Sequence, residues 1–483
     1  MNDTTLLWLV IWMLVGAVLG ALITPFLYRQ KGRRVQEGLL VGAIMGAVGT
    51  VLLLPFWSVA PETISARIVL GIPGILLLLL PLWIWALRLD GGRRPRTRRD
   101  LFVANLLDLL PTALVPVYGV VAAIAIIILI LQSQNADPQL AWDYLYDGTL
   151  ASAINRADVA AFWMPLAITS FGLVLTYNSG LWNIGVEGQV IMGAIGTTWA
   201  VRLFAGTVDA GPQIDLGLGH TVILLLCFIF GALVGGLWAA IAAVLKTRGG
   251  VNEIFGGVAL NFIAQTFNMY LISNGGPWQP TGSRATETAI FAPIARLVPY
   301  NEHRHLSLTT VYITVGAFIV VALIMYISRW GLELRAMGKN IKSAYLRGIH
   351  TERNIILAMA MCGALAGLAG AFRVMGPFEV RAKLTANPSG GLGFLAIMVV
   401  LLASMSVILT PLVSFVFAVL SKGGESVENG FNWATPPIKI DRSLVQVLQS
   451  TLVLLVVLAF GVRNRFFAPR HVQVMDDDEV ART

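Results

Sequence analysis

A short stretch of this sequence places hydrogen-bonding side chains and glycines between two apolar runs, residues 162–176 and 190–204. Its amide and carboxylate residues and its glycines are Asn178, Gly180, Asn183, Gly185, Glu187, Gly188 and Gln189. Amide and carboxylate groups donate and accept hydrogen bonds, so they suit the binding of a polar solute. Because no nucleophile with an adjacent base is visible, the chemistry indicated is recognition of a solute and not covalent catalysis.

Two helix ends must hold these side chains in place. By hydropathy both flanking runs belong in a bilayer, where a carboxylate costs about 2.5 kcal/mol or more and therefore faces a cavity or a partner. A helix break at membrane depth needs protein or water around its freed backbone groups, and transporters place substrate sites at such breaks. Two interpretations of residues 177–189 fit: a broken membrane helix that forms a binding site, or a short polar loop at one membrane face.

Glu187 has two possible roles within this stretch. Its carboxylate can accept hydrogen bonds from the hydroxyl groups of a solute. It can also hold the break together by binding backbone N–H groups that have lost their helical partners. The glycines beside it allow the backbone to bend or to approach a neighbour closely.

Composition places the chain among polytopic membrane proteins. Of its 483 residues, 57% are hydrophobic and 12% are charged, whereas soluble proteins carry about 25% charged residues. The apolar segments reach the length of about 17–25 residues that crosses a bilayer. The basic residues gather in a few loops, so the net charge of +8 is a signal of topology and not of nucleic acid binding. Cys227 and Cys362 fall in apolar runs and suit packing.

The chain is expected to have three parts. Residues 1–100 form a membrane addition of about three helices with a basic cytoplasmic linker, whose role the sequence does not reveal. Residues 101–470 form the main transmembrane domain, and residues 471–483 form an acidic cytoplasmic tail. Basic loops near residues 29–34 and 88–99 place the amino terminus outside the cell.

The main domain is expected to be all-α, with about ten transmembrane helices and a broken helix at residues 183–189. Hydropathy places its spans at residues 112–131, 160–176, 189–204, 222–245, 254–273, 309–328, 355–375 and 444–461. Glycine clusters occur on two of them, at Gly231, Gly235 and Gly236 and at Gly363, Gly367 and Gly370. The runs 394–402 and 409–420 are short, and they are either a pair of thin spans or a re-entrant hairpin.

A second polar pattern starts at Asn252 and Glu253, which suit the beginning of a helix. Asn261, Gln265 and Asn268 follow at helical spacing, so they share one face of the span expected over residues 254–273. Asn261 lies near the middle of this span. It is therefore a candidate for lining a solute pathway.

A third pattern lies in the basic segment 329–353. Asn340 suits a helix N-cap, and Ile341, Ala344 and Tyr345 recur at the i, i+3 and i+4 positions of one helix face. Such an apolar strip fits a groove on a partner protein. The alternative is a basic loop that faces lipid.

Together the three patterns, in residues 183–189, 250–261 and 331–349, resemble motifs of ABC importer permeases. The family is that of simple-sugar and nucleoside permeases, which are similar to branched-chain amino acid permeases. The resemblance covers roughly residues 104–467. The sequence departs from the motifs at Trp182, Lys339 and Ser343.

The resemblance implies a membrane permease that provides the pathway for a nucleoside or a simple sugar. The residues implied in the substrate pathway are Asn183, Glu187, Gln189, Asn261 and Gln265. A short coupling helix is implied to dock on a separate ATPase through Asn340, Ile341, Ala344, Tyr345 and Arg347. The expected partners are this ATPase, which holds ATP and magnesium, a second and different permease chain, an extracytoplasmic substrate-binding protein and membrane lipid.

Other functions stay open at this point. An ion-coupled secondary transporter would use Glu187 and Glu253 to bind a proton or Na⁺, and a branched-chain amino acid permease would share the same architecture. A membrane enzyme is disfavoured, because no catalytic constellation and no G-x-x-x-x-G-K-[ST] loop occurs. His303 and His305 alone are too few for a metal site. No cofactor, metal or nucleic acid is expected on this chain, which is placed in the inner or plasma membrane with its carboxyl terminus in the cytoplasm.

Overall fold

The computed structural model describes residues 136–273, 275–300, 306–376 and 382–433, together with the single residues 131, 450 and 454. The membrane addition predicted for residues 1–100 and the tail predicted for residues 471–483 lie outside the described residues. The spans predicted at 112–131 and 444–461 lie outside them too, apart from those single positions. All described residues from 141 to 433 belong to one compact unit, which is formed by residues 141–446.

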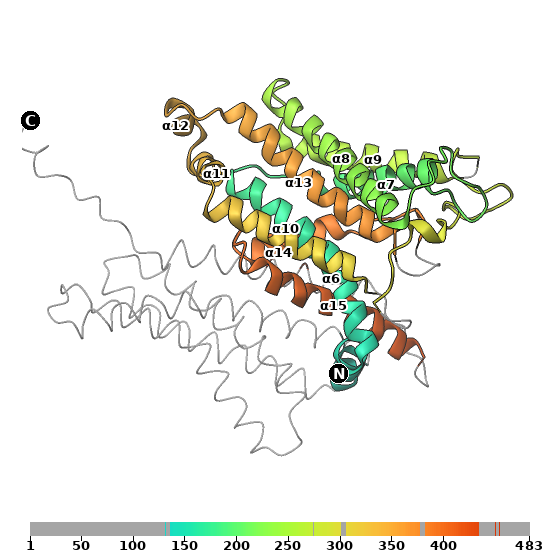
Figure 1. The fold of residues 1–483 in the computed structure, drawn as a ribbon. Coiled ribbons are helices and arrows are strands. Elements are labelled where there is room, and N and C mark those ends of the chain that lie inside the picture. Colours follow the sequence, from blue (N-terminus) through green and yellow to red (C-terminus); the bar gives the residue numbers. More distant parts are fainter. Residues whose placement is uncertain are drawn as a thin grey trace, which may run out of the picture. The chain divides into compact units, whose positions relative to one another are not determined.

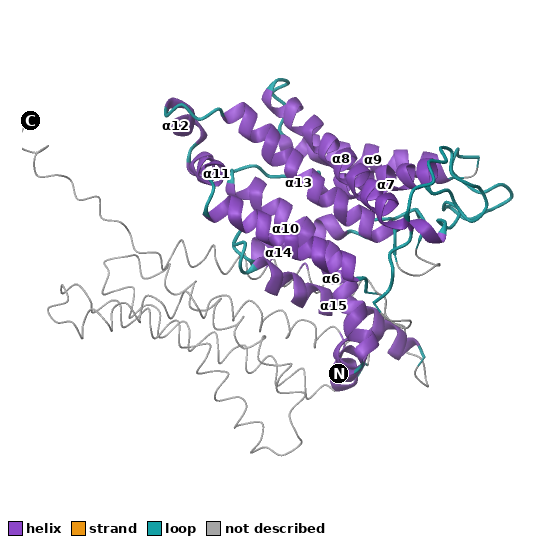
Figure 2. Cartoon of the chain, viewed as in Figure 1, coloured by secondary structure: helices purple, strands orange, loops and turns teal. Residues whose placement is uncertain are grey.

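The described part of the chain is helical (Figures 1 and 2), with no strand among its residues. Its α-helices are α5 (Pro138–Tyr146), α6 (Ala153–Asn178), α7 (Val186–Phe204), α8 (His220–Thr247), α9 (Glu253–Ile272), α10 (Leu308–Tyr326), α11 (Arg329–Lys339), α12 (Ile341–Leu346), α13 (Thr351–Val374), α14 (Leu392–Leu402) and α15 (Thr410–Asn432). A π-helical turn, η1 (Asp147–Ala151), precedes α6, and a 3-10 turn, η2 (Pro293–Ala295), lies in a long loop.

Four of the described helices, α6, α8, α10 and α13, are long and apolar enough to cross a membrane. They agree with spans predicted from hydropathy, although α6 starts earlier than predicted because Ser152 caps it by accepting a hydrogen bond from the backbone N–H of Asn155. The prediction of an all-α polytopic membrane protein is confirmed. The total of about ten core helices stays a prediction, because two of the predicted core spans lie outside the described residues.

At the centre of the unit lies α7, which is buried throughout residues 186–198 and packs against α8, α9, α13 and α14. Glycines allow its closest contacts. A Cβ atom on Gly193 would lie well inside 3.0 Å of Gly367, and one on Gly367 would lie as close to the carbonyl oxygen of Gly231. The two glycine clusters predicted in the sequence therefore meet each other, and α7 joins them at the same point.

The short runs near residues 394–420 form one short helix and one long helix. The 11 residues of α14 measure about 16 Å, roughly half of the hydrocarbon core of a bilayer. The 23 residues of α15 continue beyond Leu420, where the apolar run ends. Lys422 and Glu425, which follow that run, pair with each other at 2.8 Å on the helix surface. The two helices are therefore unequal, and only α15 has the length of a span.

The unit has two distinct ends. In Figure 1, α11 and α12 lie at one end, and the long loops 205–219 and 275–300 gather at the other. Hydrogen bonds join loop 275–300 to the chain that follows α13: the backbone N–H of Phe291 donates to the carbonyl of Ala382 at 2.8 Å, and that of Leu297 donates to the carbonyl of Met375 at 3.1 Å. We call residues 329–346, which form α11 and α12, the coupling segment.

Candidate functional site

The polar stretch of the sequence contains a non-helical connection between α6 and α7, residues 179–185, which we call the connecting segment. It leaves α6 beside α11 and returns toward the start of α7 (Figure 1). Its side chains alternate between buried and less buried positions, and Ser179, Leu181 and Asn183 are at most 1% exposed. One side of the break therefore packs against protein, whereas Gly180 and Trp182 on its other side are exposed.

Asn183 and Gln189 bind each other across the start of α7. The Asn183 amide donates to Gln189 Oε1 at 3.1 Å, and the Gln189 amide donates to Asn183 Oδ1 at 2.9 Å. Asn183 Nδ2 also lies 3.1 Å from the sulfur of Cys362, near the middle of α13. Both amides are 1% exposed. This reciprocal pair holds the connecting segment against the first turn of α7.

Glu187 joins α7 to the beginning of α14. Its Oε1 accepts a hydrogen bond from the hydroxyl of Ser389, and its Oε2 accepts one from the backbone N–H of Gly393 at 2.7 Å. The first N–H groups of a helix have no partner inside the helix and attract negative charge. Glu187 therefore caps α14 from another helix. Gly393 makes this possible, since a Cβ atom there would lie 2.6 Å from the Cα of Glu187.

The polar face predicted for the helix over residues 254–273 is confirmed in α9. The Asn261 amide donates to the carbonyl of Ile184 at 2.9 Å and accepts from the N–H of Gly188 at 2.7 Å. Ahead of α14, the Gln265 amide donates to the carbonyl of Ala386 and the Asn268 amide donates to the carbonyl of Thr385. One face of α9 thus binds the connecting segment and also residues 385–386, which precede α14. The predicted cap by Asn252 is also confirmed, since its side chain accepts from the N–H of Ile254 at 2.9 Å.

Asn261→Leu is expected to destabilise the protein more than Gln265→Leu. The first substitution leaves two backbone groups, at Ile184 and Gly188, without their partner, whereas the second leaves one. Each unpartnered buried group costs about 1–3 kcal/mol. The melting temperatures of the two purified variants test this order. Equal melting temperatures would show that the Asn261 amide does not hold the break.

The structure brings the five predicted pathway residues to one region. Asn183, Glu187 and Gln189 lie at the start of α7, and Asn261 and Gln265 face that region from α9. In this conformation each of them is bound to other groups of the chain. Contact with a solute therefore stays a prediction. The sequence did not reveal that Ser389 and Gly393 complete the site, because their spacing from Glu187 is long and carries no motif.

The predicted coupling residues lie on α12 and at its ends. Asn340 is the N-cap, as predicted, and its Oδ1 accepts from the N–H of Ser343 at 3.0 Å. Ile341 and Tyr345 are 38% and 67% exposed, whereas Ala344 is 3% exposed and packs against its own chain. Leu346, which sequence reasoning missed, is 84% exposed. Arg347 is the C-cap of α12.

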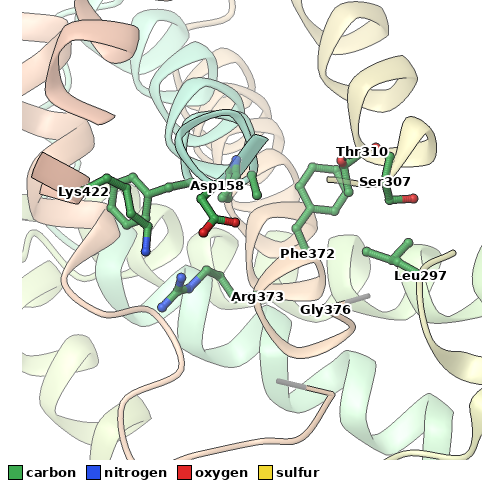
Figure 3. Close-up of a pocket in the computed structure, with 11 residues that line it drawn as sticks. Asp158, Leu297, Ser307, Thr310, Phe372, Arg373, Gly376 and Lys422 are labelled. Atoms are coloured by element: carbon green, nitrogen blue, oxygen red, sulfur yellow. Dashed lines mark hydrogen bonds between the residues drawn. The ribbon is translucent and has the colours of Figure 1, made fainter. Parts of the chain in front are cut away.

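A small polar cavity lies among α6, α10, α13 and α15, away from the connecting segment. Figure 3 shows Asp158, Arg373 and Lys422 on one side of it and Ser307 and Thr310 on the other. Its volume is about 60 Å³, far below the roughly 300–1,000 Å³ of ligand pockets. The Ser307 hydroxyl is buried and has no partner among the described residues. The cavity therefore suits a few water molecules and not a solute.

Metal-binding groups do not gather in the described residues, where no cluster of three or more His, Cys, Asp or Glu side chains occurs. His303 and His305 lie outside these residues. Cys227 and Cys362 are both buried and free. Glu253, the second acid considered above for ion binding, pairs with Lys246 at 2.6 Å.

The fold and the site define a class of protein: a polytopic α-helical membrane protein in which a polar segment interrupts two buried helices. The chain belongs to the family described as "Branched-chain amino acid transport system / permease component", whose model matches residues 155–458. It is therefore a permease subunit. No solved structure matches the chain.

Relatives support this membership over most of their own length. The chain is 29% identical over 371 residues to a glucose ABC transporter permease protein of Haloferax volcanii, covering 75% of this chain and 90% of the relative. It is 26% identical over 354 residues to a guanosine ABC transporter permease protein of Bacillus subtilis, covering 72% of this chain and 94% of the relative. A nucleoside ABC transporter permease protein of Lactococcus lactis is 25% identical over 354 residues, covering 72% and 91%.

Proposed function

We propose that this chain is the permease subunit of an ATP-driven importer and that it provides the pathway for a nucleoside or a simple sugar. The observation that carries this proposal is its similarity to the glucose, guanosine and nucleoside permeases over at least nine-tenths of each relative. The family description names branched-chain amino acids, but the relatives above name a sugar or a nucleoside. The nucleoside or sugar pathway is therefore the better supported of the two.

The proposed assembly contains a cytoplasmic ATPase, which binds ATP and magnesium, a second permease chain and an external substrate-binding protein. Two relatives from Bacillus subtilis support a mixed permease pair, because both are named guanosine permeases and they are different chains. One is 26% identical to this chain over 354 residues, and the other is 24% identical to it over 237 residues. The exposed side chains of α12 support docking of the ATPase there. In this assembly the amino terminus lies outside, the carboxyl terminus lies in the cytoplasm, and the chain itself binds no cofactor.

The proposed mechanism uses the contacts of the connecting segment. In the present conformation Glu187 ties α7 to α14, and Asn261 ties α9 to the break. Movement of these helices would release the hydrogen-bonding groups of Asn183, Glu187 and Gln189 toward a solute. An ion-coupled transporter is less well supported, because Glu253 is paired with Lys246 and both oxygens of Glu187 are bound to protein donors.

The function is tested by purifying the full chain in detergent, identifying co-purifying proteins by mass spectrometry and reconstituting the complex in vesicles. We expect an ATPase and a second permease to co-purify. Uptake of radiolabelled guanosine or glucose should then require ATP. Uptake driven by an ion gradient without ATP would overturn the proposal in favour of the ion-coupled alternative.

The double variant Tyr345→Ala and Leu346→Ala is expected to release the ATPase from the purified complex. These side chains are 67% and 84% exposed on α12, and burying one such side chain in an interface contributes about 1.5–3 kcal/mol. Loss of both should weaken the affinity about 100-fold or more. The control is Leu237→Ala on α8, where the side chain is 65% exposed. Equal recovery of the ATPase with both variants would argue against docking at α12.

A further inference from the structure

Two glycines bring the coupling segment against the connecting segment. A Cβ atom on Gly338, near the end of α11, would lie well inside 3.0 Å of the carbonyl oxygen of Asn178, a separation that real Cβ atoms almost never show. A Cβ atom on Gly180 would lie 3.3 Å from the Cα of Gly338. Gly180 has a φ of 78°, in the left-handed region that glycine adopts without penalty. The two segments therefore meet backbone to backbone.

The coupling segment is firmly held on its side of this contact. Leu334 and Met337 are at most 1% exposed, so α11 is anchored in the unit by its apolar face. The Glu333 carboxylate accepts a hydrogen bond from Asn354 of α13 at 2.7 Å. Asn340 begins α12 only two residues after Gly338. Because so few residues separate α12 from Gly338, a movement of α12 is passed directly to Gly338.

The connecting segment is held on the other side. The Asn178 amide donates to the carbonyls of Val174 at 2.8 Å and Met405 at 2.9 Å, which ties the end of α6 to the loop between α14 and α15. Beyond Gly180, Asn183 is bound to Gln189 of α7. Between these anchors no side chain separates Gly180 from Gly338. If α11 moves, no side chain between Gly180 and Gly338 can change its rotamer to take up the movement.

We infer that Gly338 and Gly180 form the contact through which movement of the coupling segment reaches the connecting segment and the helices that it joins. This inference rests on the proposed function of an ATP-driven importer. Gly338 is a positioning residue, since it lies among backbone atoms of the chain itself. A methyl group there would force the two backbones apart by about 1 Å, because packed interiors contain no spare volume. The coupling segment would then move without carrying the connecting segment with it.

The test compares Gly338→Ala with Gly316→Ala in the purified complex of this chain and its ATPase, reconstituted in vesicles. Gly316 lies on α10, where an added Cβ atom would meet no neighbouring group among the described residues. We expect Gly338→Ala to retain the ATPase and its ATP hydrolysis while uptake of guanosine or glucose falls at least tenfold. The ATP consumed per molecule transported should rise by the same factor. Gly316→Ala should match the wild type in both quantities. If Gly338→Ala consumed the same amount of ATP per transported molecule as the wild type, the inference would be overturned.

If Gly338→Ala does not assemble with the ATPase, a second measurement tests the inference. Hydrogen–deuterium exchange of the wild-type complex is compared without nucleotide and after trapping with ADP and vanadate. The inference expects the amides of residues 180–185 to change their exchange together with those of α11, and such a change supports it. Unchanged exchange in residues 180–185 overturns it. A wild-type complex without ATP-driven uptake would instead overturn the proposed function itself.

Discussion

Gly367→Ala is expected to lower the melting temperature of the purified protein by about 2–5 °C, or to prevent its recovery as a single species. Gly367 lies where α13 meets α7 and α8, and an added Cβ atom would overlap the backbone of Gly231. Forcing extra volume into a tightly packed interior costs about 1–3 kcal/mol, and here three helices would have to separate.

Gly316→Ala on α10 is the matched control for this prediction, because among the described residues no atom outside the local helix backbone lies within 4 Å of its added Cβ. Alanine favours a helix over glycine by about 0.5–1 kcal/mol, so this variant should be unchanged or slightly more stable. The two substitutions add the same methyl group and are expected to act in opposite directions. A melting temperature of Gly367→Ala equal to that of Gly316→Ala would show that the glycine contact is not close.

Glu187→Ala is expected to reduce uptake at least tenfold while the ATPase still co-purifies. The substitution leaves the N–H of Gly393 without its acceptor and leaves the hydroxyl of Ser389 with only the more distant Asn387 Oδ1, at 3.3 Å. Each unpartnered buried donor costs about 1–3 kcal/mol, so α14 loses its attachment to the start of α7. Uptake in vesicles and the amount of bound ATPase are the two quantities to measure.

Two further variants separate the roles of Glu187. Ser389→Ala should reproduce part of the loss if the carboxylate acts by holding α14, and the double variant with Glu187→Ala should then be no worse than Glu187→Ala alone. The surface control is Glu352→Ala. In the wild type, Glu352 pairs with Arg248, and the two side chains are 54% and 71% exposed. Such an exposed ion pair contributes about 0–1 kcal/mol to stability. Normal uptake by Glu187→Ala would remove this residue from the site. A loss that Ser389→Ala does not share would point to direct solute contact.

Hydropathy and local chemistry predicted much of this protein. Apolar runs located α8, α9, α10 and α13 closely, since a bilayer requires long apolar helices whatever their neighbours are. The cap by Asn340 was also predictable, because a cap depends on groups within a few residues. The length of α15 was not, because polar residues after Leu420 interrupt the apolar run although the helix continues.

The sequence by itself determined the class of the protein, the position of the helix break and the polar residues around it. These depend on composition and on spacing along the chain. Only the tertiary structure decided which groups those residues bind. Glu187 caps α14 from more than 200 residues away, and Gly338 meets Gly180 across a gap of more than 150 residues. Such contacts leave no periodic signal, because each depends on how whole helices pack and not on the residues beside it.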